Sequence, residues 1–261
     1  TENGTLTINK ASIPITITTD SNSKTYDGTP LADNGYTLTG TLAAGDSETV
    51  VITGTLTNAG SALNTVTTVA IYHGTTDVTE NYVIEKVNGS LSVVKRNVTI
   101  TANSANKTYD GTVLTNSGYS ITSGSFVAGE GLISVTVVGS QLFVGSSSNE
   151  ITTYTLNGST YANNYNITTA NGTLTIERAS IAITITADSN SKTYDGTPLT
   201  DSGYTLTGTL AAGDSETVVV TGTLTNAGSA LNTVTSVTIY HGTTDVTENY
   251  VIEKVNGSLS V

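Results

Sequence analysis

The chain has 261 residues, and its 9 Lys and Arg against 21 Asp and Glu give a formal net charge of −12. Such an acidic chain repels nucleic acid and anionic lipid, so charge excludes both as partners. Cys, Met and Trp are absent, which excludes disulfides and thiolate chemistry. No apolar run reaches the roughly 18 residues of a membrane span, so membrane insertion is not expected.

Alternating apolar and polar residues predict short strands along the whole chain. Residues 1–10 match the segment 170–178 and are expected to be the final strand of a preceding repeat. Strands are then expected at 13–18, 36–39, 50–57, 66–72, 82–84 and 91–93, separated by turn signals rich in Gly, Asn and Asp. Asn88-Gly89, Asn171-Gly172 and Asn256-Gly257 favour type I′ hairpin turns between the last two strands of each repeat, and Asp27-Gly28 favours another tight turn.

The segment Lys-Thr-Tyr-Asp-Gly-Thr begins at residues 24, 107 and 192, and an Asn-Tyr pair follows each copy at the same distance. We therefore expect three β-sandwich repeats, at 11–94, 95–178 and 179–261, each with about seven strands. The outer copies are nearly identical, so the residues that the divergent middle copy still shares are the informative ones. These expected structural residues are Lys24, Tyr26, Asp27, Gly28, Asn81, Tyr82, Asn88 and Gly89, then Lys107, Tyr109, Asp110, Asn164 and Tyr165, then Lys192, Tyr194, Asp195, Asn249 and Tyr250.

These paired motifs resemble the MBG and YDG repeats (mostly-β, glycine-rich) of bacterial surface adhesins, over essentially the whole chain. The resemblance implies an all-β chain of tandem immunoglobulin-like β-sandwich repeats. Short junctions without a Pro- or Gly/Ser-rich linker favour repeats arranged end to end. The resemblance also implies an extracellular protein of the bacterial cell surface, which is either anchored in the cell wall or outer membrane or secreted.

Two groups of shared residues call for an interpretation, the tyrosines and the pair of Lys24 and Asn81. The recurring tyrosines are expected to be core or corner tyrosines with buried rings and paired hydroxyls. Lys24 and Asn81 suggest a spontaneous isopeptide bond with Asp27 as the buried acid, which needs a desolvated lysine. The favoured interpretation is the other one, a solvated Lys24 beside a turn and an Asn81 that caps a loop.

No enzyme, metal site or cofactor is predicted. His73 and His241 occupy equivalent positions, have no counterpart in the middle repeat and are expected to be exposed loop residues. No Ser/His/Asp arrangement is shared by all copies. The carboxylates that loops could bring together for calcium are expected to be solvated turn residues instead: Asp20, Asp27, Asp46 and Asp77.

The favoured function is a structural stalk or spacer of a cell-surface adhesin, which projects a distal binding domain from the envelope. The alternative is that the repeats themselves bind host glycan or a matrix or mucin protein, and the loop 72–81 is then the candidate patch. Neighbouring repeats of the same chain are the expected partners. Host glycan or protein is expected to bind through other domains, and the chain is expected to be a monomer.

Overall fold

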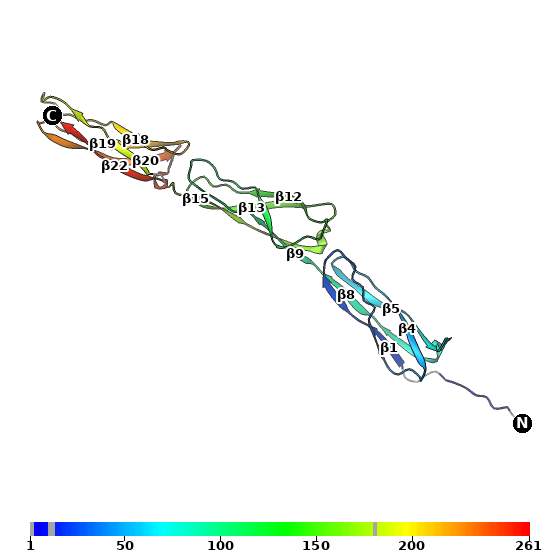
Figure 1. Cartoon of the computed structure of the whole chain (residues 1–261). Coiled ribbons are helices and arrows are strands. Elements are labelled where there is room, and N and C mark those ends of the chain that lie inside the picture. Colours follow the sequence, from blue (N-terminus) through cyan, green and yellow to red (C-terminus); the bar gives the residue numbers. More distant parts are fainter. Residues whose placement is uncertain (1–2, 10–13, 180–181) are drawn as a thin grey trace. The chain divides into compact units, whose positions relative to one another are not determined.

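A computed structural model describes residues 3–9, 14–179 and 182–261 of the chain (Figure 1). The fold is all-β, as predicted, and the described residues contain no α-helix. The chain forms two compact units, and the boundary between them runs through the middle repeat. The units are Thr1–Ile100, Ile121–Ser134 and Thr155–Thr168 on the one side, and Thr101–Ser120, Val135–Tyr154 and Thr169–Val261 on the other.

The first repeat has two sheets that pack over one core. Ile17 of one sheet and Val66 and Val69 of the other lie in the same buried cluster. The first sheet has the order β3(Tyr36–Thr39)-β1(Pro14–Thr19)-β7(Val83–Val87). The second has the order β2(Asn22–Thr25)-β8(Gly89–Val94)-β5(Gly60–His73)-β4(Asp46–Thr53), with β6(Thr76–Asp77) paired to β5 and the 3-10 turn η1(Thr79–Asn81) before β7.

The same strand order recurs twice. The middle repeat has the sheets β11(Tyr119–Gly124)-β9(Arg96–Ala102)-β14(Tyr165–Ala170) and β10(Ala105–Thr108)-β15(Gly172–Glu177)-β13(Gly145–Leu156)-β12(Leu132–Val138), with η2(Ala162–Asn164). The last has β18(Tyr204–Thr207)-β16(Ala182–Ala187)-β22(Val251–Val255) and β17(Asn190–Ser191)-β23(Gly257–Ser260)-β20(Ser229–His241)-β19(Asp214–Thr221), with β21(Thr244–Asp245) on β20 and η3(Thr247–Asn249).

Two parallel segments cross together from one sheet to the other in the first repeat. Pro14 of β1 faces Val83 of β7, and Asn22 of β2 faces Leu91 of β8. The two residues of each pair are 69 positions apart in the sequence. The same separation holds where the segments cross between the sheets, because the Ser90 amide donates to the Ser21 hydroxyl 69 residues away. The middle and last repeats keep this offset in β10–β15 and in β16–β22. The first and last strands of a repeat therefore form one continuous parallel ribbon.

The predicted type I′ hairpin turns at Asn88-Gly89, Asn171-Gly172 and Asn256-Gly257 are wrong. Neither residue of any pair has a positive φ, and β7 and β8 belong to different sheets. Asn88 Oδ1 instead accepts the Val66 amide at 3.0 Å. A Cβ at Gly89 would overlap the carbonyl oxygen of Asp20, so glycine is needed because two backbones approach closely at the crossing.

The predicted strand at residues 1–10 is not observed, since residues 3–9 form no strand and residues 1, 2 and 10 lie outside the described residues. Leu6 and Ile8 are 99% and 92% exposed, whereas the equivalent Leu174 and Ile176 of β15 are fully buried. The difference arises because β15 pairs with β10 and β13, while residues 3–9 have no paired strand. The expected strand start at Ile13 also falls outside the described residues.

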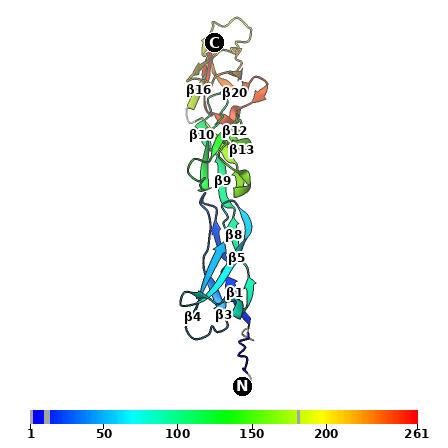
Figure 2. The same cartoon turned by 90° about the vertical axis from the view of Figure 1, so that its right-hand side faces the viewer.

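The connection between the first two repeats is a single residue, because β8 ends at Val94 and β9 begins at Arg96 (Figures 1 and 2). Two buried clusters contain residues of successive repeats. Tyr26, Val93 and Tyr165 share one of them, and Tyr109, Ile176 and Tyr250 share the other. The apolar core thus continues across each junction within its own compact unit.

Candidate functional site at the repeat junctions

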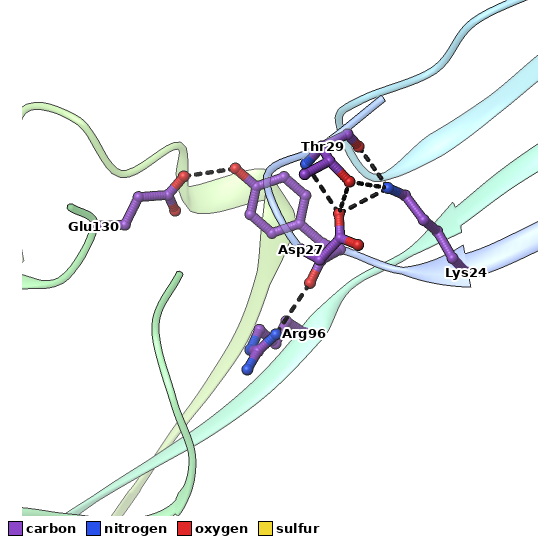
Figure 3. Close-up of polar contacts among 6 residues, drawn as sticks. Lys24, Asp27, Thr29, Arg96 and Glu130 are labelled. Atoms are coloured by element: carbon purple, nitrogen blue, oxygen red, sulfur yellow. Dashed lines mark hydrogen bonds and ion pairs between the residues drawn. The ribbon is translucent and has the colours of Figure 1, made fainter. Parts of the chain in front are cut away.

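One carboxylate joins two tyrosines at the first junction. Tyr26 follows β2, and Tyr165 begins β14 of the next repeat. Their rings meet edge to face with centroids 5.6 Å apart. The Tyr26 hydroxyl donates to Glu130 Oε1 at 2.6 Å (Figure 3). The Tyr165 hydroxyl donates to the other oxygen, Glu130 Oε2, at 2.6 Å. We call this arrangement a tyrosine–carboxylate bridge.

A tight turn positions the carboxylate of this bridge. The Glu130 amide donates to the Val127 carbonyl at 2.9 Å, and Gly129 takes a positive φ of 84°. The Val127 amide in turn donates to the Tyr165 hydroxyl at 3.0 Å. The Tyr165 hydroxyl is therefore both an acceptor and a donor, which satisfies its hydrogen-bonding capacity inside the junction.

The second junction repeats the bridge with an aspartate. The Tyr109 hydroxyl donates to Asp214 Oδ1 at 3.0 Å, and the Tyr250 hydroxyl donates to Asp214 Oδ2. The two rings again meet edge to face, with centroids 6.2 Å apart. The Ala211 amide donates to the Tyr250 hydroxyl at 3.0 Å, as Val127 does at the first junction. The backbone contributes as well, since the Ala212 amide donates to the Asp110 carbonyl at 3.1 Å.

The bridge holds its tyrosines in the protonated, donating form. Burial raises the pKa of Tyr165 to about 12, with a further contribution from its bond to Glu130. Burial and then the bond to Asp214 raise the pKa of Tyr109 and of Tyr250 above the ordinary tyrosine range. The bond to Glu130 raises the pKa of Tyr26. At neutral pH each hydroxyl therefore donates to a carboxylate, and such charge-assisted bonds are the stronger kind.

Further contacts at the first junction come from an asparagine and an arginine. The buried Asn164 accepts the Ala59 amide at 2.8 Å and donates to Asn58 Oδ1 at 3.0 Å. The Arg96 guanidinium donates to the Tyr26 carbonyl at 3.4 Å (Figure 3). It also donates to the Ser125 carbonyl at 2.6 Å. Asn164 and Arg96, both of the second repeat, therefore bind residues of the first repeat.

In each bridge, the tyrosine of the preceding repeat (Tyr26 or Tyr109) lies on a short loop that is held by an ion pair. Lys24 Nζ donates to Asp27 Oδ1 at 2.7 Å and to the Thr29 carbonyl at 2.6 Å (Figure 3). Asp27 Oδ1 also accepts the Thr29 amide at 2.9 Å, and Gly28 has a φ of 81°. This confirms the predicted Asp27-Gly28 turn. We call the segments 24–29, 107–112 and 192–197 donor loops, because Lys107 and Lys192 make the same contacts.

The structure excludes the isopeptide bond suggested for Lys24 and Asn81. Lys24 faces Val93 at one end of the parallel ribbon, whereas Asn81 precedes β7 at the other end. Ten strand residues, roughly 30 Å, separate the two positions. Asp27 is not a buried acid either, since its side chain is 47% exposed. Lys24 lies in β2 directly before the Asp27-Gly28 turn, as the other interpretation predicts, but its side chain is only 20% exposed, so the prediction of a solvated lysine is wrong.

The tyrosine prediction is confirmed for five of the six residues and wrong for the sixth. Tyr26, Tyr82, Tyr109, Tyr165 and Tyr250 are buried. The partners of Tyr26 and Tyr109 nevertheless belong to the following repeat, which the sequence interpretation did not foresee. We call Asp46, Glu130 and Asp214 the acceptor carboxylates, because each accepts a tyrosine hydroxyl. Tyr194 is 59% exposed, because none of them lies against it in the part of the chain that the structure describes.

The acceptor carboxylates were missed as functional residues. Asp46 was expected to be a solvated turn residue, yet its side chain is 8% exposed and accepts the Tyr82 hydroxyl. Glu130 and Asp214 were not singled out. A signal was available, because Ala-Gly-Asp or Ala-Gly-Glu recurs at residues 44–46, 128–130 and 212–214.

The two histidines lie beside acceptor carboxylates. His73 Nδ1 lies 2.7 Å from Asp46 Oδ1, and its side chain is exposed, as predicted. His241 Nδ1 lies 2.6 Å from Asp214 Oδ1, but its ring also packs against Phe143 of the preceding repeat, which reduces its exposure. The prediction of an exposed loop residue is therefore wrong for His241.

Neither a metal centre nor an aromatic patch is found among the expected residues. The described residues include no cluster of three or more His, Cys, Asp or Glu side chains that could hold a metal ion. Within the described ranges, none of the exposed tyrosines lies in the loop 72–81. No described helix is long and apolar enough to cross a membrane.

Comparison with known proteins gives no assignment. No protein-family model matches the chain, and no curated protein matches it either.

Proposed function

We propose that the chain is a stretch of structural stalk repeats of a bacterial cell-surface adhesin, and that its repeats hold a distal binding domain away from the envelope. The observation that carries this proposal is the tyrosine–carboxylate bridge. It recurs at both junctions with different residues, Glu130 in one and Asp214 in the other. A spacer needs junctions that resist bending, whereas a simple string of domains does not.

Three features of the junctions support stiffness. Lys95 alone separates β8 from β9, so little chain is free to rotate between them. The apolar cluster of Tyr26, Val93 and Tyr165 would become exposed to water if the junction opened. Each bond from a tyrosine to the carboxylate contributes about 1.5–3 kcal/mol when it is intact, and opening the junction would lose one such bond.

The immunoglobulin-like character, the surface location and the non-catalytic role belong to the same proposal. Two packed sheets per repeat support the sandwich part of this proposal, while the parallel β1–β7 and β2–β8 pairs differ from the antiparallel sheets of an immunoglobulin domain. The chemistry that recurs at both junctions consists of hydrogen-bonded tyrosines and carboxylates. Such an arrangement uses its hydroxyl and carboxylate groups to bind a neighbouring repeat, which supports a structural role.

Small-angle X-ray scattering of the whole chain in dilute solution tests the proposal. A stalk predicts a rod-like profile with a maximum dimension of roughly 100–120 Å, from the length of three strands placed in line. A matched variant with Tyr26→Ala and Tyr109→Ala should give a broader distribution of distances, because both bridges are lost. A compact or strongly bent particle for the unaltered chain would contradict the spacer function.

A further inference from the structure

The first repeat holds both of its terminal strands at the centre of a sheet. β1 lies between β3 and β7, and β8 lies between β2 and β5. β1 pairs four residues with β3 and five with β7, and β8 pairs four residues with β2 and five with β5. Neither strand can therefore leave the repeat without breaking a ladder of hydrogen bonds on each of its two sides.

A pulling force along the chain reaches the repeat through these two strands. The chain enters β1 at Pro14 and leaves β8 at Val94, where Lys95 alone leads into β9 of the next repeat. Pro14 faces Val83 at one end of the parallel ribbon. Val94 faces Thr25 at the other end. The two points of load therefore lie at opposite ends of the ribbon.

This placement loads the hydrogen bonds of the ribbon in shear. The bonds of a parallel pair are evenly spaced along the two strands, so a pull on opposite ends of the pair stretches all of them together. In a hairpin, by contrast, both load points lie at the same end, and the bonds open one after another. The ribbon is also closed beyond β2, where the Tyr26 amide donates to the Val94 carbonyl at 2.9 Å.

Buried side chains add to the resistance of the ribbon against sliding. Ile15 and Ile17 of β1, and Leu91 and Val93 of β8, are at most 2% exposed. Successive side chains of a strand point to opposite faces of the sheet, so a slip of one residue would turn these four side chains out of the core. Sliding therefore breaks hydrogen bonds and exposes apolar surface in the same step.

The crossing between the sheets leaves no gap in the ribbon. The Gly89 amide donates to the Thr19 hydroxyl at 2.6 Å, and the Ser90 amide donates to the Ser21 hydroxyl at 3.0 Å. The two bonded segments, β1–β7 and β2–β8, are thus joined by further hydrogen bonds at the point where they change sheet.

The same ribbon occurs in the other two repeats. The Thr173 amide donates to the Ser104 hydroxyl, and the Ser258 amide donates to the Ser189 hydroxyl, both at 3.0 Å. The two residues of each pair are 69 positions apart, as in the first repeat.

We propose that each repeat bears load along the chain, with its parallel ribbon as a mechanical clamp, that is, a set of bonds that a pulling force must break together. A force that extends the chain meets the ribbon in its strongest direction, whereas a force across one end of the ribbon opens it bond by bond. This inference does not rest on the stalk function. Scattering tests the stiffness of the junctions, and pulling tests the strength within one repeat.

Single-molecule force spectroscopy tests the proposal by pulling the same repeat in two directions. The chain has no cysteine, so a pair of introduced cysteines defines where the force acts. Thr7→Cys with Lys95→Cys loads opposite ends of the first ribbon. Pro30→Cys with Lys95→Cys loads one end only, because Pro30 follows β2 and Lys95 follows β8. All three positions are exposed, so neither pair removes a core contact.

A third variant loads the other end of the ribbon. Thr7→Cys with Asn81→Cys pulls the starts of β1 and β7 apart, since Asn81 precedes β7. Asn81 is exposed as well. Forced unfolding is governed by the rate of unfolding and not by its equilibrium free energy, so the three variants should have equal urea midpoints and still differ in strength.

At one loading rate, the unfolding force of the variant loaded at opposite ends should be several times higher than that of either variant loaded at one end. The proposal is overturned if this force is equal to or below that of the variants loaded at one end. It is equally overturned if β1 or β8 detaches in a separate step at low force when opposite ends are pulled.

Discussion

At the residue scale, the junctions depend on a carboxylate that has few other partners. Glu130 accepts a tyrosine on each oxygen, one from its own repeat and one from the preceding repeat. Because both tyrosine rings are buried, an unpaired hydroxyl there would cost the free energy of desolvation. The bridge thus makes the correct pairing of repeats favourable and a mismatched pairing unfavourable.

Removing one hydroxyl from the bridge should weaken the chain without changing its shape. Tyr109→Phe keeps the ring that packs on Tyr250 but removes the donor to Asp214. We expect the free energy of unfolding of the second junction to fall by about 1.5–3 kcal/mol. Tyr194→Phe is the control, because Tyr194 is exposed, and it should leave the stability unchanged. Equal urea midpoints for the two variants would contradict the role of the bridge.

The junction tyrosines should also make the chain sensitive to alkaline pH. The pKa of Tyr165 is raised to about 12 in the folded chain, and its ordinary value is about 10. A raised pKa in the folded state contributes stability that is fully present below about pH 10 and is lost as the pH rises towards 12. We expect the free energy of unfolding to be flat below this window and to fall within it.

Ultraviolet absorbance of tyrosinate checks this expectation directly. The buried tyrosines of the junctions should ionise late in an alkaline titration, only as the junctions open. Tyr165→Phe should reduce the amplitude of this late ionisation. A single titration step shared by all tyrosines would contradict the assignment.

At the element scale, the crossing of the parallel ribbon explains an error of the sequence interpretation. Asn-Gly between two apolar runs is a strong hairpin signal, but it indicates only that the backbone at that point can adopt conformations that most residues avoid. Here that freedom serves the close approach of Gly89 to the carbonyls of Thr19 and Asp20. In a hairpin, β8 would pair with β7, whereas at the crossing it pairs with β2. The local sequence does not indicate which of these strands is the partner.

A side chain at the crossing should therefore be costly even though the backbone of Gly89 is unstrained. Gly89→Ala places a Cβ against two backbone oxygens that cannot move without breaking the ribbon. We expect a loss of roughly 1–3 kcal/mol in the free energy of unfolding, as for other overpacked sites. Gly158→Ala is the control, because nothing lies within 4 Å of the added Cβ there. Thermal unfolding of the two variants measures the difference.

Alternation and turn residues were sufficient to predict an all-β chain and most strand positions. The segment 36–39, for example, was predicted with the bounds that β3 has. They were insufficient for β2, whose Asn-Ser-Lys-Thr sequence has no apolar residue and which forms only because β8 lies beside it. The bridge was missed for a related reason. Tyr26 and Glu130 are 104 residues apart, and repeat comparison aligns equivalent residues without revealing which of them meet.

At the scale of the whole molecule, the junctions should couple the unfolding of neighbouring repeats. In a repeat array, stability is approximately the sum of each repeat's own stability and that of its interfaces with its neighbours. Gly111 lies at such an interface, and a Cβ there would overlap the carbonyl oxygen of Ala212. We expect Gly111→Ala to weaken the second junction, so that a single cooperative transition separates into two.

Gly196→Ala supplies an unusually close control. Gly196 and Gly111 have almost the same φ, 81° and 78°, so alanine introduces the same backbone strain at both positions. Nothing lies within 4 Å of a Cβ at Gly196, so only Gly111→Ala adds a clash with the following repeat. Calorimetric unfolding should therefore stay cooperative in Gly196→Ala and divide in Gly111→Ala. If both variants unfold alike, the effect is local backbone strain, and the junction does not transmit stability between repeats.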